Sequence, residues 1–94
     1  MALARVVSFE GVSGERAAQL AREVGEEPPP EGIPATEIIM LHDPDAERSV
    51  VIVFFDTEED YQRGDTTLDA MPADETPGRR TSVAKYEVTV RRKV

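Results

Sequence analysis

An arginine inside an apolar stretch is the first residue in this sequence that could do chemistry. In the predicted first strand, Arg5 is separated by an even number of residues from three apolar residues: Leu3, Val7 and Phe9. Successive side chains of a strand point to opposite faces, so the side chain of Arg5 falls on the same, otherwise buried row as these three. A guanidinium in such a row can bind a carboxylate or phenolate ligand through its fixed set of donors. The alternative is an ion pair with a carboxylate on a neighbouring strand, such as Glu37 or Glu87.

Two further side chains are candidates for orienting a substrate or moving a proton. Tyr86 lies mid-strand, where its phenol either hydrogen-bonds a ligand or packs in the core with one partner for its hydroxyl. His42 is the only histidine, and Asp43 and Asp45 follow it. These three residues could form a metal or acid–base cluster, but one histidine beside two turn aspartates is more typical of a hydrated hairpin. His42 is therefore kept as a weak candidate for proton transfer.

Motifs for a bound cofactor are missing. The sequence contains no nucleotide-binding glycine loop, no Ser-His-Asp ordering and no metal-ligand spacing. It also has no cysteine, which excludes disulfides, thiolate nucleophiles and cysteine-based metal centres. We therefore expect no metal and no bound cofactor.

The charge of the chain argues against two classes of partner. Eleven basic and 19 acidic residues give a net charge of −8, which is the wrong sign for binding phosphates or anionic lipid surfaces. We expect neither a nucleic acid nor a membrane partner. The first residues lack the charged-then-apolar design of a secretory signal. Together with the absence of cysteine, this predicts a cytoplasmic protein.

The elements that must position these side chains are organised around residues 49–55, Ser-Val-Val-Ile-Val-Phe-Phe. Six consecutive apolar residues, all β-branched or aromatic, predict a strand that is covered on both faces. A helix entry follows at once, with Asp56 as N-cap and Glu59 three positions later as its capping-box partner.

The remaining pattern predicts strands over 3–10, 35–41 and 81–92, and helices over 14–24 and 57–70. In the first helix, Ser13 is the expected N-cap, Gly25 the expected C-terminal glycine, and four residues form an apolar stripe: Ala17, Leu20, Ala21 and Val24. In the second helix, Gly64 would permit close packing. The connections 26–34 and 73–80 are predicted as surface segments.

The order β-α-β-β-α-β predicts a single ferredoxin-like α+β domain over residues 1–94, with a four-stranded antiparallel sheet and both helices on one face. Two helices cover only one face of such a sheet, whereas the second and third strands are apolar on both faces. A second copy, packed sheet against sheet, is the simplest cover. The sequence therefore predicts a homodimer.

With this order the chain resembles the dimeric α+β barrel superfamily, which contains antibiotic-biosynthesis-monooxygenase-like (ABM-like) domains. The resemblance rests on length, element order and two passages: Val-Ile-Val-Phe-Phe-Asp-Thr-Glu-Glu-Asp-Tyr at 51–61 and Arg-Thr-Ser-Val-Ala-Lys-Tyr-Glu-Val at 80–88. Members of that superfamily include cofactor-free monooxygenases, haem-degrading enzymes, isomerases and proteins with no known activity. The resemblance thus implies a fold and leaves the function open.

Neither catalytic set of the superfamily transfers to this chain. Monooxygenase members typically surround an aromatic substrate with tryptophan, asparagine, tyrosine or arginine, and this chain has no tryptophan and no asparagine. Haem-degrading members use a histidine from a helix, whereas His42 ends a predicted strand.

Two functions from different classes are compatible with the sequence. The first is a pocket between sheet and helices that binds or oxidises a small apolar or aromatic molecule without a cofactor, with Arg5 and Tyr86 orienting it and His42 as the proton-transfer candidate. The second is a non-enzymatic structural or regulatory homodimeric module. The sequence leaves open whether the protein is an enzyme.

Overall fold

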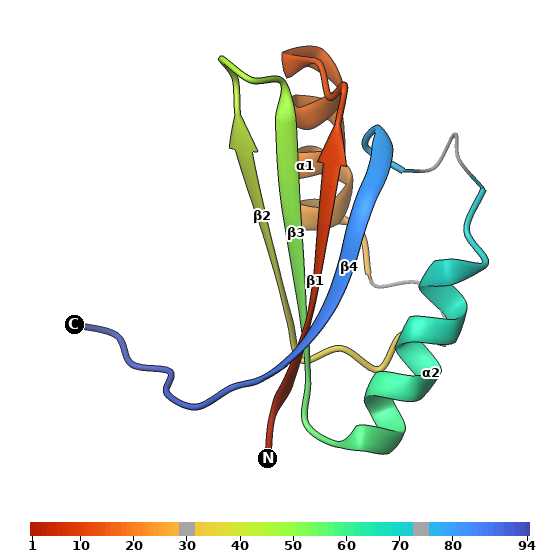
Figure 1. The fold of residues 1–94 in the computed structure, drawn as a ribbon, viewed down its shortest axis with the longest axis vertical. Coiled ribbons are helices and arrows are strands. Elements are labelled where there is room, and N and C mark those ends of the chain that lie inside the picture. The colour runs from red at the N-terminus through yellow and green to blue at the C-terminus, as the bar shows by residue number, and fades with distance from the viewer. Residues whose placement is uncertain (29–31, 73–75) are drawn as a thin grey trace.

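The chain folds in the order β-α-β-β-α-β, and the computed structural model describes residues 1–28, 32–72 and 76–94. The elements are β1 (Leu3–Glu10), α1 (Gly14–Glu26), β2 (Glu37–Asp43), β3 (Arg48–Phe55), α2 (Glu58–Asp69) and β4 (Arg79–Glu87) (Figure 1). The strands form one antiparallel sheet in the order β2-β3-β1-β4. This confirms the predicted ferredoxin-like α+β fold. Residues 29–31 and 73–75, within the predicted surface connections 26–34 and 73–80, lie outside the described residues.

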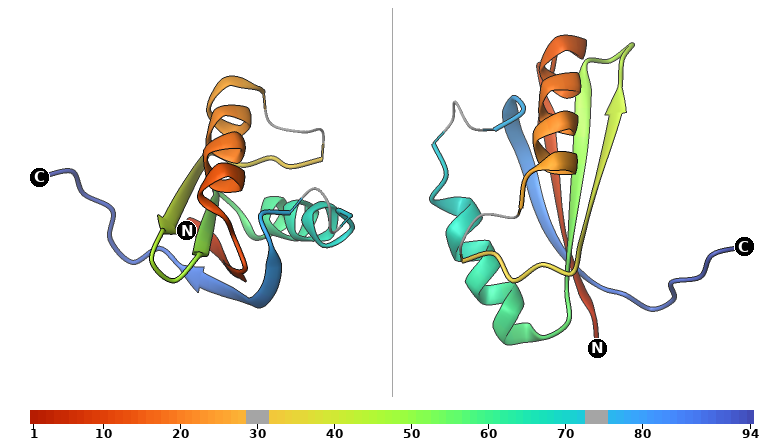
Figure 2. Two further views of the ribbon diagram at one scale, coloured as in Figure 1. Left: turned by 90° about the horizontal axis from the view of Figure 1, so that it is seen from above. Right: turned by 180° about the vertical axis from the view of Figure 1, so that it is seen from behind.

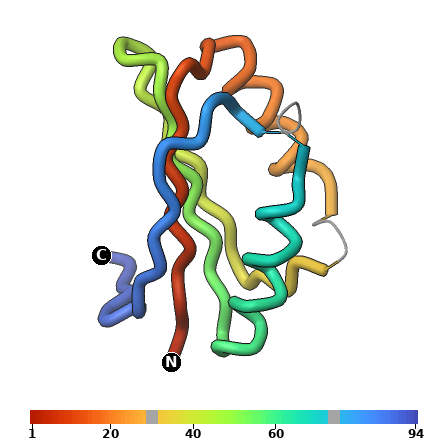
Figure 3. The backbone as a smooth tube through the Cα atoms, turned by 45° about the vertical axis from the view of Figure 1, so that its right-hand side comes forward, coloured from red at the N-terminus to blue at the C-terminus, as the bar shows by residue number. Residues whose placement is uncertain are grey.

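Both helices lie on one side of the sheet (Figure 2). They follow one another along the strands, with α1 near one end of the sheet and α2 near the other (Figure 3). The opposite side of the sheet carries no helix. We call it the open face.

The strand register decides which side chains point to the helices. Arg5 lies opposite Val53 of β3, and Ile38 of β2 lies opposite the same valine. Because paired residues point to the same face of a sheet, the odd positions of β1 and β3 form the helix-covered row. Two buried clusters result: Leu3, Ile33, Val53, Phe55 and Tyr61 in one, and Val7, Phe9 and Val12 in the other.

The open face carries apolar side chains on all four strands. Its apolar residues include Val6, Ile39, Leu41, Val50, Ile52, Phe54, Ala84 and Tyr86, and the polar residues Ser8, Glu37, Asp43, Arg48 and Ser82 occupy other alternate positions of the same face. Leu41 is 54% exposed and Tyr86 is 57% exposed. The segment after β4 crosses one end of this face (Figure 1), where the Arg91 guanidinium lies 4.1 Å from the centre of the Phe54 ring.

The N-cap of α2 differs from the prediction by one residue. Thr57, rather than Asp56, has the extended backbone of a cap, and its hydroxyl accepts a hydrogen bond from the backbone N–H of Asp60 at 3.1 Å. The acidic residues Glu58, Glu59 and Asp60 then occupy the first turn, where they interact favourably with the helix dipole. The predicted Asp56–Glu59 capping box was therefore wrong.

The first helix begins as predicted and ends later. The Ser13 hydroxyl accepts from the N–H of Arg16 at 3.1 Å, which confirms the N-cap. Gly25 was expected to end the helix but lies within it, and the cap is Glu27. Glu27 precedes Pro28, and a residue before proline is disfavoured in the helical region. The proline ends this helix.

The apolar stripe predicted for this helix is only partly buried. Leu20 is buried, whereas Ala21 and Val24 are exposed.

The last strand is shorter than predicted. It ends at Glu87 rather than at residue 92, because its partner β1 begins at Leu3, which lies opposite Glu87. One further hydrogen bond, from Val88 N–H to the carbonyl of Ala2, extends the ladder to the first residues of the chain.

Candidate functional site: a cavity beside a buried arginine

A cavity of about 180 Å³ lies between the sheet and the two helices. Most of its wall is apolar: Val7, Phe9, Val51 and Val53 from the central strands, Ile38 and Met40 from β2, Leu20 and Val24 from α1, Leu68 from α2, and Ile33, Met71 and Pro77 from the connections. Three polar residues complete the described wall: Arg5, Thr76 and Arg80. The arginines are the charged groups among these lining residues.

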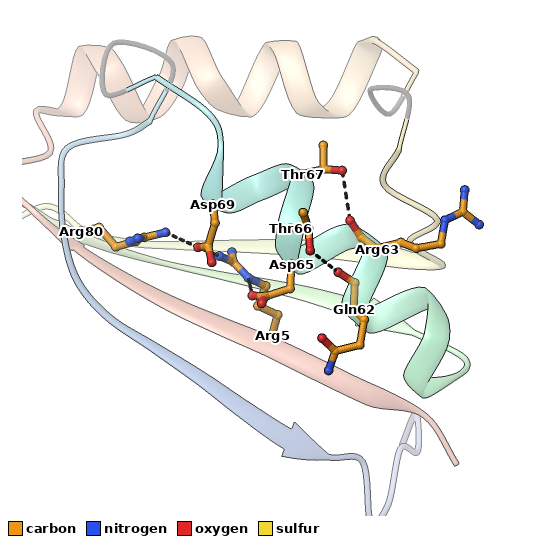
Figure 4. Close-up of polar contacts among 8 residues, drawn as sticks. All are labelled: Arg5, Gln62, Arg63, Asp65, Thr66, Thr67, Asp69 and Arg80. Atoms are coloured by element: carbon orange, nitrogen blue, oxygen red, sulfur yellow. Dashed lines mark hydrogen bonds and ion pairs between the residues drawn. The ribbon is translucent and has the colours of Figure 1, made fainter.

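Arg5 is held by two carboxylates of α2. Its side chain rises from β1, with the residue only 3% exposed. Nε donates to Asp65 Oδ1 at 2.8 Å, and Nη2 donates to Asp69 Oδ1 at 3.0 Å (Figure 4). Asp65 and Asp69 are four residues apart on a helix, so both carboxylates project from the same side of α2 toward the sheet.

The burial of Arg5 was predicted correctly, but the predicted ion-pair partners were wrong. The strand residues beside Arg5 are Val53 and Lys85, neither of which is an acid. Glu37 lies opposite Phe54 on the open face, where it pairs with Arg91. Glu87 lies opposite Leu3, at the end of the sheet. The helix supplies the counter-charges that the neighbouring strands lack.

A second arginine shares one of these carboxylates. Nη1 of Arg80, at the start of β4, donates to Asp69 Oδ1 at 2.7 Å. The ion-pair cluster, defined here as Arg5, Asp65, Asp69 and Arg80, therefore contains two positive and two negative charges. Asp65 and Asp69 do not line the cavity, whereas both arginines do. The two cations of the cluster thus border the cavity, and its two carboxylates do not.

The start of α2 is fixed to β4 by a second polar contact. Lys85 forms an ion pair with Glu58, and its Nζ lies 4.9 Å from the centre of the Tyr61 ring. The hydrogen bond from Lys85 lowers the pKa of Glu58. Burial raises the pKa of Tyr61, and the negative charge of Asp65 adds to that effect. The Tyr61 phenol therefore stays neutral and packs edge-on against Phe55.

Tyr86 and His42 lie elsewhere. Tyr86 is opposite Ala4 on the open face, away from the cavity. His42 is on the helix side of β2, opposite Ser49, and its Nδ1 lies 2.8 Å from the Ser49 hydroxyl. Its Nε2 is buried and has no hydrogen-bond partner among the described residues. His42 is not among the described residues that line the cavity.

The Asp43 carboxylate organises the hairpin that follows His42. Its Oδ1 accepts hydrogen bonds from the N–H groups of Asp45 and Ala46, both at 3.1 Å. The bond from Ala46 makes the largest contribution to lowering the pKa of Asp43. Within the described ranges, no group of three or more histidine or acidic residues is arranged to hold a metal ion.

The structure therefore brings only Arg5, of the three predicted candidates, to the cavity. Sequence reasoning missed Asp65, Asp69 and Arg80. The Asp-x-x-x-Asp spacing of the helix was the available signal, because it places two acids on one helical face that could meet a buried arginine.

Neither the models of known families, nor the curated proteins, nor the solved structures include a significant match to this chain. Within the described ranges, the helices lack the combination of length and apolar composition that crossing a membrane requires. The geometry of the cavity and of the open face is therefore the basis for a functional proposal.

Proposed function

We propose that the protein is a cytoplasmic homodimer that binds a small, largely apolar or aromatic molecule in the cavity between its sheet and its helices. The observation that carries the proposal is the apolar wall of this cavity beside one buried guanidinium. Ligand sites in proteins are commonly apolar hollows in which a few polar groups fix the orientation of the ligand. The dimeric α+β barrel arrangement, with ABM-like domains among its examples, is the assembly that the sequence resembles.

The open face supports the dimer. Large apolar side chains run across all four strands there, and Leu41 and Tyr86 are more than half exposed. Exposed apolar surface of this kind is typical of an interaction site. A second copy offers the same surface, so two open faces can pack about a two-fold axis.

Binding is better supported than oxidation. Arg5 can orient a ligand through its donors, but His42 is not among the described cavity-lining residues, and Tyr86 lies on the other side of the sheet. A base must come within hydrogen-bond reach of the proton it removes. We therefore assign no catalytic residue and no bound cofactor.

A non-enzymatic structural or regulatory homodimer is the second candidate function. It is favoured by the ion pairs of Arg5, because a guanidinium that already contacts two carboxylates can serve to attach α2 to the sheet. Under this alternative the open face still forms the dimer, and the cavity has no specific ligand.

Native mass spectrometry of the purified protein, compared with its denatured mass, tests the assembly and the ligand together. A dimer that carries additional non-covalent mass supports both parts of the proposal. A bare dimer favours the structural alternative, and a monomer contradicts the sheet-to-sheet packing.

A matched pair of valine variants tests the cavity. Val24 and Val83 are each 41% exposed, but only Val24 lines the cavity. Val24→Phe should fill part of the volume and weaken the binding of ethylbenzene by about tenfold, whereas Val83→Phe should leave it unchanged. Nuclear magnetic resonance titration measures both. Equal affinities in the two variants would mean that ethylbenzene binds somewhere else.

A further inference from the structure

Both arginines of the cluster line the cavity, and each has a guanidinium nitrogen for which no hydrogen bond is observed among the described residues. Arg5 uses Nε and Nη2 for its two carboxylates, and its Nη1 donates to no acceptor among the described residues. Arg80 uses Nη1 for Asp69. Guanidinium groups have donors only, and the acids that contact them do not line the cavity. A ligand there gains by bringing an acceptor.

The charge balance of the cluster decides which kind of acceptor fits. Two guanidinium groups face two carboxylates, so the four side chains sum to zero, and the chain as a whole carries −8. A ligand anion would add a third negative charge to the cluster and would lose its hydration in an apolar cavity. A neutral carbonyl oxygen can accept from Arg5 without either penalty.

The volume limits the size of the ligand. A cavity of about 150 Å³ in another protein holds benzene, and the present cavity measures about 180 Å³. The cavity therefore accommodates a ligand that consists of one benzene-sized ring and a short substituent.

From these observations we infer that the cavity selects small neutral carbonyl compounds, such as aromatic ketones or aldehydes, whose oxygen accepts a hydrogen bond from Arg5. This inference rests on the proposed function of the cavity and adds the chemical class of the ligand. It also replaces the carboxylate or phenolate that an unpaired arginine would favour, because Asp65 and Asp69 already neutralise the cluster.

Three probes of similar size separate the alternatives in a calorimetric or magnetic resonance titration. Acetophenone supplies a carbonyl, ethylbenzene supplies no strong acceptor, and benzoate supplies an anion. We expect acetophenone to bind about tenfold more tightly than ethylbenzene, and benzoate to bind most weakly. Acetophenone should also shift the guanidinium resonances of Arg5, which ethylbenzene should leave in place.

Two carboxamide variants test the charge balance directly. Asp69→Asn removes one negative charge from the cluster, so the affinity for benzoate should rise by about tenfold. Asp56→Asn changes the net charge equally at an exposed position outside the cluster, and it should leave the affinity for benzoate unchanged. Equal effects of the two variants would overturn the charge argument.

The outcomes distinguish this inference from the function on which it rests. If ethylbenzene binds as tightly as acetophenone, the apolar cavity stands and the carbonyl inference is wrong. If benzoate binds most tightly to the unmodified protein, the ligand is an anion and the inference is again wrong. If none of the three probes binds, both the inference and the proposed binding function fail.

Discussion

The ring of Phe55 lies directly against the backbone of Gly64. A Cβ atom at residue 64 would overlap Cε1 and Cζ of that ring, and Phe55 itself is completely buried at 0% exposure. Phe55 is the last residue of β3, and Gly64 lies in the middle of α2. The missing side chain therefore sets how closely this helix approaches the sheet, and with it the position of the acids that bind Arg5.

Replacing Gly64 with alanine should destabilise the protein, although alanine is the better helix former. The added methyl group has no space, because Phe55 is enclosed and also packs against Tyr61 with ring centres 5.5 Å apart. We expect the free energy of unfolding to fall by about 1–3 kcal/mol, as for other overpacked cores. Denaturant unfolding followed by circular dichroism measures the change.

Gly25→Ala is the matched control. Gly25 also lies within a helix, but a Cβ there meets nothing within 4 Å. The same substitution should therefore raise the free energy of unfolding by about 0.5–1 kcal/mol. If both variants shift stability in the same direction, the close approach of α2 to Phe55 is not what requires glycine at residue 64.

The fold was predictable because periodic signals are local. The sequence correctly predicted a strand from the apolar run at 49–55 and another from the alternation in 3–10. It also correctly predicted close packing at Gly64. The ends of elements were less predictable, since Thr57 competes with Asp56 as a cap and a strand stops where its partner stops. The partners of Arg5 depended on how α2 lies across β1, which is tertiary information that the pattern of a single strand does not contain.

Arg5→Lys should destabilise the protein more than Arg80→Lys does. A lysine at residue 5 keeps the charge but lacks the planar fork that reaches Asp65 and Asp69 together. Because the site is buried, we expect a loss of about 1–3 kcal/mol. Arg80 contacts the same Asp69 from a more exposed position, so its replacement should change stability by less than about 0.5 kcal/mol. Equal losses would show that burial does not strengthen the pairing of Arg5.

Stability should fall in acid partly through Glu58. Lys85 holds the pKa of Glu58 below its usual value, so the folded state releases this proton more readily than the unfolded chain does. The resulting stabilisation is present above the unfolded pKa, near 4.3, and is lost as the pH falls through the lower folded pKa. The difference in Tm between the unmodified protein and Glu58→Gln should therefore be positive at about pH 7 and shrink toward zero at about pH 3.

Glu59→Gln is the control for this pH dependence. Glu59 is adjacent and exposed, and it pairs with no cation among the described residues. Its replacement should give a smaller difference in Tm at neutral pH. If Glu58→Gln gives a difference that does not change with pH, the pair with Lys85 does not contribute to folding in solution.

A charge on the open face should separate the two copies of the proposed dimer without unfolding either. Leu41 is 54% exposed in the single chain, so Leu41→Glu places its carboxylate in water in a monomer but between two apolar sheets in a dimer. Burying an unpaired charge is strongly unfavourable, and sedimentation at micromolar concentration should therefore show a folded monomer. Val83→Glu places the same charge on the helix side of β4 and should leave the dimer intact. A dimer that tolerates Leu41→Glu would place its interface on another surface, and the apolar open face would then need a different explanation.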